Sequence, residues 1–160
     1  IGIYEITFDD SNKKDQKYYT NTNQTYTYDA DAGTVTASYG TATPKAHADT
    51  LFTAQDETDG KGTEGEVAVE GLKTILIRNI KSQAETELSR TDWYITRKSE
   101  KNTAIPSAIT THRDAVRTKQ DSMCTAITNA SNTPALETLY TYAEQEDGSV
   151  TRPLGEIPTL

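Results

Sequence analysis

Three residues of this chain, His47, His112 and Cys124, belong to the types that serve as nucleophiles, bases or soft metal ligands. On one helix, the spacing of His112 and Cys124 would separate them by about 18 Å, which is too far for a Cys–His nucleophile pair. A structural zinc ion needs four ligands, usually Cys and His at short spacing, and the chain has three such residues. We therefore expect no catalytic residue, no bound metal and no cofactor.

An acidic segment, residues 55–66, partly imitates a calcium-binding loop. If Gly60 is placed at the sixth position of such a loop, Glu66 falls at the twelfth, but Gln55 then stands where an Asp is required and Gly62 where an apolar residue is usual. This mismatch favours a solvated acidic linker. The chain also has no glycine-rich phosphate loop and no G-x-S-x-G elbow. A hydrolase that uses a carboxylate pair in a cleft is the enzymatic alternative.

The composition limits the partners. The 160 residues carry a net charge of −8, which opposes broad nucleic-acid binding because phosphates must be neutralised by basic residues. No apolar run approaches the ~20 residues of a membrane span, and a single cysteine fits a reducing compartment. Leu, Ile, Val and Phe total only 26 residues. We therefore expect neither nucleic acid nor membrane as partner, and a thin core that gains stability from neighbouring subunits.

The pattern predicts an α+β fold divided near residue 66. Residues 1–66 should form a small antiparallel β module of three or four strands with one face covered, followed by the acidic linker. Ile1–Phe8 and the hairpin of Thr25–Tyr28 with Thr34–Tyr39, turning at Gly33, are its expected strands.

Residues 67–160 should form a helical hairpin, then a short helix from Thr133 and an extended tail. The first helix is indicated by apolar residues at every third or fourth position, namely Val69, Leu72, Leu76, Ile80, Ala84 and Leu88. The second opens at Ile105-Pro106-Ser107, where proline suits the first helical turn, and its stripe is Ile109, His112, Val116, Met123 and Ile127.

The most distinctive string lies between the two helices, and it contains the only tryptophan. Its pattern is Leu88-x-x-Thr91-Asp92-Trp93-Tyr94, then Arg97-Lys98, Ala104-Ile105-Pro106, Arg113 and Val116-Arg117. This pattern resembles the C-terminal module of tail-fibre-assembly-like proteins and related virion proteins of tailed bacteriophages, especially phages of cyanobacteria. The ending, with Leu139–Tyr142 and Arg152–Glu156, is similar to the same group. His112 departs from the family, in which Tyr or Phe usually stands.

The resemblance implies a non-enzymatic structural component of a phage virion, in the tail, baseplate or fibre-attachment region. Such a protein is assembled in the bacterial cytoplasm and remains in the particle. Its expected partners are other virion proteins, as a homo-oligomer or a multi-copy assembly. A tail-fibre assembly chaperone and a head decoration protein are the alternatives.

Two groups of residues are the candidate interface or structural sites. Trp93 and Tyr94 are expected to plug the open end of the helical hairpin, with Arg97, Arg113 and Arg117 stacking on the rings or pairing with Glu87 and Asp92. Replacing a buried Trp93 with Ala would cost about 3–5 kcal/mol. The alternative is that this group is a partner-binding hot spot. In the β module, Tyr26, Tyr28 and Tyr39 are expected at a contact with neighbouring subunits.

Overall fold

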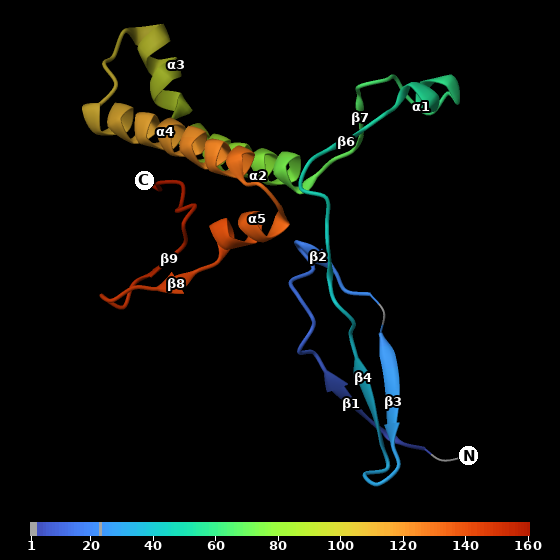
Figure 1. The fold of residues 1–160 in the computed structure, drawn as a ribbon. Helices are drawn as coiled ribbons and strands as arrows, with labels where there is room; N and C mark the ends of the chain where they lie inside the picture. Colours follow the sequence, from blue (N-terminus) through green and yellow to red (C-terminus); the bar gives the residue numbers. More distant parts are fainter. Residues whose placement is uncertain (1–2, 23) are drawn as a thin grey trace. The chain divides into compact units, whose positions relative to one another are not determined.

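The computed structural model describes residues 3–22 and 24–160, and it has an α+β fold with the strands concentrated in the first half (Figure 1). The chain divides into two compact units, Ile1–Ala46 and His47–Leu160. This boundary lies earlier than the expected one at residue 66. Hydrogen bonds join His47 and Asp49 to residues 71–74, at the start of the first long helix. Ile1 and Gly2, the start of the first expected strand, lie outside the described residues.

The first unit contains a three-stranded sheet in which β4 (Thr34–Ser38) lies between β1 (Glu5–Asp9) and β3 (Thr25–Asp29) (Figure 1). The β3–β4 hairpin is antiparallel, as expected, and Gly33 at its turn has a φ of 64°, which suits glycine. However, β1 runs parallel to β4. The prediction of an antiparallel module was therefore wrong. The reason is that β3 runs in the direction opposite to β1. The next strand, β4, turns back at the hairpin and therefore runs in the same direction as β1, beside which it lies.

A second, two-stranded pair in this unit joins β2 (Tyr19–Thr20) to β5 (Thr43–Pro44). Among the described residues of the first unit, few apolar side chains are buried, namely Tyr18, Tyr19, Ala37 and Ala42. The expected covered face of the sheet is not observed, because β1 and β3 are exposed along their whole length.

The second unit begins with an arm, residues 50–69, that is more ordered than a linker. In it β6 (Thr50–Leu51) pairs with β7 (Val67–Val69), and between them lies α1 (Ala54–Thr58). A capping box starts α1, since the Thr53 hydroxyl accepts from the Asp56 N–H while the Asp56 carboxylate accepts from the Thr53 N–H. Val69, expected on the first long helix, belongs to β7 instead.

Two long helices, α2 (Leu72–Ser89) and α4 (Ser107–Asn129), pack against each other as the expected hairpin. Their contact buries most of both predicted stripes: Leu76, Ile80, Ala84, Val116, Met123 and Ile127 are almost fully inaccessible. The segment between them is not a simple connection, because it forms a further helix, α3 (Asp92–Lys101), which ends at Asn102 in the left-handed conformation.

The chain then forms α5 (Thr133–Tyr140), which begins at the expected residue and is capped by the Asn132 side chain, and the short hairpin β8 (Ala143–Glu144) and β9 (Val150–Thr151). The tail is fixed by Leu154, which is buried, and by Arg152. The guanidinium of Arg152 lies 5.0 Å from the Tyr140 ring centroid and 5.3 Å from that of Tyr142. Within the described residues, no helix combines the length and the apolar character that crossing a bilayer requires.

Candidate functional site

The residues with catalytic potential are dispersed. Among the described residues, no three His, Cys, Asp or Glu side chains are grouped as metal ligands would be. His112 lies 3.2 Å from the Glu87 carboxylate, whereas burial raises the pKa of the Cys124 thiol and so disfavours its reactive thiolate form. Neither arrangement combines a nucleophile with a base.

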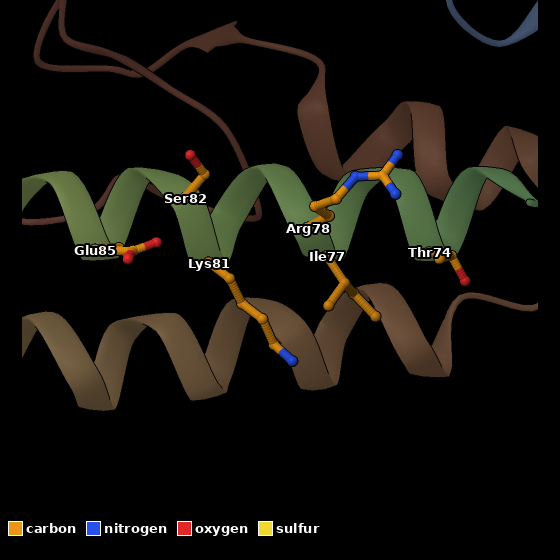
Figure 2. Close-up of a pocket in the computed structure, with 6 residues that line it drawn as sticks. All are labelled: Thr74, Ile77, Arg78, Lys81, Ser82 and Glu85. Atoms are coloured by element: carbon orange, nitrogen blue, oxygen red, sulfur yellow. The ribbon is translucent and has the colours of Figure 1, made fainter.

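One open hollow of about 450 Å³ lies along α2, and all of its lining residues belong to that helix (Figure 2). Ile77 and Lys81 point toward the neighbouring helix, and Arg78 lies on the other side of α2. Arg78 is occupied, because its guanidinium donates two hydrogen bonds to the Glu70 carboxylate, at 2.6 and 2.8 Å. The hollow is therefore a shallow one-helix surface and does not bring an acid and a base together.

The sheet of the first unit has one apolar face. The strand register sets Ile6 and Tyr28 beside Val35, and it sets Phe8 and Tyr26 beside Ala37, so these six side chains share one face. Tyr4 continues the face, because its ring centroid lies 4.7 Å from that of Tyr28. The expected site residues Tyr26 and Tyr28 thus lie on one surface.

The opposite face of the same sheet is polar. It carries the alternate residues, and the hydroxyls of Thr7 and Thr36 (3.0 Å) and of Thr25 and Ser38 (3.1 Å) are hydrogen-bonded across the strands.

Tyr39, the third expected tyrosine, follows β4 and is half-buried. The Lys13 ammonium lies 5.6 Å from the centroid of its ring. The apolar face is therefore the part of this unit that exposes large apolar and aromatic side chains, namely Tyr4, Ile6, Phe8, Tyr26 and Tyr28.

Trp93 does not plug the hairpin. It lies on α3 and is 50% exposed, so the prediction of a buried aromatic lock was wrong. Its contacts are local: the Trp93 and Tyr94 ring centroids are 3.7 Å apart, and the Arg97 guanidinium lies 4.8 Å from the first ring and 5.5 Å from the second. The stacking of Arg97 on the rings agrees with the sequence-based expectation. The physical reason for the correction is that the segment after Thr91 forms the helix α3, which has no buried residue, in place of a loop that closes the hairpin.

The end of the hairpin is held by Arg113 instead. This buried guanidinium contacts the α2–α3 junction, where one nitrogen, Nη1, lies 2.8 Å from the Leu88 carbonyl, 2.6 Å from Thr91 Oγ1 and 2.8 Å from Asp92 Oδ1. The expected pairing of Arg113 with Asp92 is thereby confirmed. Arg117 behaves differently, since it is exposed and pairs with Asp114 on its own helix.

A buried carboxylate, Glu87, is the residue that the sequence did not single out as a centre. Its oxygens accept from the Leu160 N–H (2.8 Å) and lie 3.2 Å from both Arg90 Nη1 and His112 Nε2. Glu87 thus connects α2, α4 and the tail. The sequence-based expectation was that Glu87 pairs with Arg97, Arg113 or Arg117, whereas its observed charged partners are Arg90 and His112.

Comparison of the chain with protein-family models, with curated proteins and with solved structures found no match.

Proposed function

We propose that this chain is a non-enzymatic structural component of a tailed-phage virion that joins neighbouring subunits in the tail, baseplate or fibre-attachment region. The resemblance of residues 88–117 to tail-associated phage proteins supports the virion assignment. The observation that carries the assembly role is the apolar sheet face of the first unit, defined by Tyr4, Ile6, Phe8, Tyr26, Tyr28 and Val35.

The area of this face suits a protein interface. With about 150–250 Å² for each whole aromatic side chain, exposures of 47% for Tyr4, 71% for Phe8, 63% for Tyr26 and 51% for Tyr28 leave roughly 450 Å² of aromatic surface uncovered. A stable interface buries about 800 Å² on each partner, so these four residues supply about half of it. Tyrosines favour such contacts because the ring buries area while the hydroxyl keeps a polar partner.

The stability of the first unit points to the same role. About 46 residues is near the size below which a single core rarely suffices, and the buried apolar side chains described above are two tyrosines and two alanines. A partner that binds only the folded form would stabilise the unit by mass action. Docking on neighbouring virion subunits, in several copies, would supply that stabilisation.

The first experiment is mass spectrometry of purified phage particles beside the infected lysate. A structural component is expected in both samples at a fixed ratio to the major tail proteins. The resemblance to tail-fibre-assembly proteins supports an assembly chaperone as second candidate, and a chaperone would be abundant in the lysate and absent from particles. That result would replace the proposal.

A matched pair of variants tests the sheet face itself. Tyr26→Glu places a charge on the apolar face, and Thr27→Glu places the same charge on the polar face of the same strand. We expect Tyr26→Glu to reduce incorporation into particles at least tenfold and Thr27→Glu to leave it unchanged. Equal incorporation of both variants, with normal circular dichroism, would show that this face is not the docking surface.

A further inference from the structure

Helix α3 carries an aromatic and basic surface. None of its ten residues is buried, although Tyr94 and Arg97 are only partly exposed. The Arg97 guanidinium lies over the Trp93 and Tyr94 rings, 4.8 and 5.5 Å from their centroids. An arginine positioned in this way has lost much of its rotamer freedom, so it can bind a carboxylate at a smaller entropic cost.

The charge of α3 is opposite to that of the chain as a whole. Its basic residues are Arg97, Lys98 and Lys101, and its acidic residues are Asp92 and Glu100, of which Asp92 is already paired with Arg113. This positive surface lies within a chain of net charge −8. Because Trp, Tyr and Arg dominate protein-binding hot spots, the residue types also favour binding of a protein segment.

The same unit carries a complementary segment on its arm. Residues 53–66 hold five carboxylates and one lysine. Lys61 pairs with Asp56 (3.2 Å) and Asp59 (3.0 Å), and the Glu57 carboxylate accepts from the Glu64 N–H. The side chains of Glu64 and Glu66 are exposed. These two carboxylates are therefore presented to solvent by an ordered, capped segment.

Both surfaces belong to one chain, but they adjoin opposite ends of α2. The arm precedes the first residue of α2, and α3 follows its last. The 18 residues of that helix measure about 27 Å. A contact between the arm and α3 must then form between two copies, and because it joins unlike surfaces it can repeat from copy to copy.

We propose that α3 of one copy binds the acidic arm, residues 53–66, of a second copy through Trp93, Arg97 and Lys98 on one side and Glu64 and Glu66 on the other. This contact would specify how copies join in the proposed multi-copy assembly. It rests on the proposed function only in the assumption that several copies of the chain assemble together. It is distinct from the sheet face, which lies in the other unit.

The experiment uses Trp93 as its own reporter, because it is the only tryptophan. The reporter chain carries Glu64→Lys and Glu66→Lys, so its α3 is intact and its arm is not. The titrant is the full chain with Trp93→Phe, which does not emit as tryptophan and keeps an intact arm. We expect a saturable blue shift of Trp93 emission, reduced acrylamide quenching, and an apparent Kd that rises at least tenfold between about 0.1 and 1 M salt, where the Debye length falls from about 10 to 3 Å.

Two controls isolate the contact. A titrant that combines Trp93→Phe with Glu64→Lys and Glu66→Lys should produce no shift. Adding Arg97→Ala to the reporter should weaken binding at least tenfold, whereas adding Arg78→Ala, which removes the same charge from the first half of α2, should change it less than twofold. The proposal is overturned if the intact titrant produces no shift, or if the titrant without the two glutamates produces the same shift. Neither result depends on whether the protein is found in phage particles.

Discussion

Arg113 shows how one side chain defines the end of the helical hairpin. Its Nη1 lies within hydrogen-bonding distance of three oxygens, two of them at Leu88 and Thr91 and the third on Asp92. The nitrogen has two hydrogens, so at least one of them is shared. Lysine would place a smaller, more strongly hydrated charge in the same pocket and lack the planar, delocalised guanidinium.

We expect Arg113→Ala to lower the free energy of unfolding by about 2–3 kcal/mol, the usual scale of buried hydrogen bonds that involve a charged group. Urea unfolding followed by circular dichroism measures this difference. The exposed Arg117 is the control, since Arg117→Ala should change stability by no more than about 0.5 kcal/mol. Equal effects of the two substitutions would contradict the assigned role of Arg113.

Trp93 should matter much less to stability than its size suggests. Because half of the residue is exposed, truncation removes mainly the contacts with Tyr94 and Arg97. We expect Trp93→Ala to cost about 1 kcal/mol, below the 3–5 kcal/mol typical of a buried aromatic. If the same urea unfolding shows a loss of about 3–5 kcal/mol in the free energy of unfolding, Trp93 contributes to stability as a buried aromatic residue would.

These residues also mark the limit of what the sequence predicts. The residue types of Trp93, Tyr94 and Arg97 were sufficient to predict that the arginine stacks on the rings, because a guanidinium is attracted to aromatic faces. They were insufficient to predict whether the stack is buried, since that depends on the direction in which α3 leaves α2. Glu87 was expected to pair with one of the three arginines, but its observed partners are Arg90, His112 on α4 and Leu160 at the end of the chain, and the last two lie far away in sequence.

At the level of elements, the start of α2 is stabilised by a residue from outside the helix. The Asp49 carboxylate accepts from the Gly71 N–H (2.6 Å) and from the Thr74 hydroxyl (2.8 Å). Gly71 is the N-cap of α2 and has no side chain to cap with, and a Cβ at this position would overlap the Ala48 carbonyl. Asp49 therefore holds the N-cap residue in place and brings a negative charge that favours the helix N-terminus, while the Lys73 N–H of the first turn donates to the His47 carbonyl.

The hydrogen bonds that the Asp49 carboxylate accepts should make the free energy of unfolding depend on pH. The hydrogen bonds from Gly71 and Thr74 hold the pKa of Asp49 below its usual range. The stabilisation is fully present above the unfolded pKa of about 3.9 and is lost as the pH falls through the lower folded value. In urea unfolding at a series of pH values, we expect the difference between wild type and Asp49→Ala to be constant near neutrality and to shrink below about pH 4. A difference that does not change with acidity would exclude the carboxylate as its source.

Local elements with strong periodicity were predictable. Most of the apolar stripes of α2 and α4, the start of α5 at Thr133 and the glycine turn of the β3–β4 hairpin appear in the structure. The parallel pairing of β1 with β4 could not be predicted, because the alternation of residues along a strand defines its two faces but not its neighbours or its direction. The arm was also missed, since its order depends on cross-strand hydrogen bonds such as that from the Phe52 N–H to the Glu66 carbonyl.

At the scale of the whole molecule, the two units differ sharply in how much core they contain. Most of the fully buried aliphatic residues, including Leu76, Ile80, Met123, Ile127 and Leu136, belong to the second unit. The second unit is therefore expected to be the more stable one, and the first to depend more on contacts outside itself.

We expect residues 47–160, produced alone, to fold with a helical circular dichroism spectrum and to unfold within about 5 °C of the corresponding transition of the full chain, a shift equivalent to about 1 kcal/mol. Limited proteolysis of the full chain should cut within residues 1–46 first. A second unit that fails to fold alone, or a protease-resistant first unit in the isolated monomer, would contradict this division.

The parallel pairing of β1 with β4 has a consequence for synthesis on the ribosome. Glu5 of β1 pairs with Thr34 of β4, so the first strand leaves the ribosome 29 residues ahead of its partner. At about 5–20 residues per second, this delay is roughly 1.5–6 s. During that time Ile6 and Phe8 have no native strand beside them, whereas the β3–β4 hairpin closes within microseconds of its emergence. The nascent chain thus presents an unpaired apolar strand to ribosome-associated chaperones, and on a crowded polysome the β4 edge of a neighbouring nascent copy is a competing partner for exchange of β1.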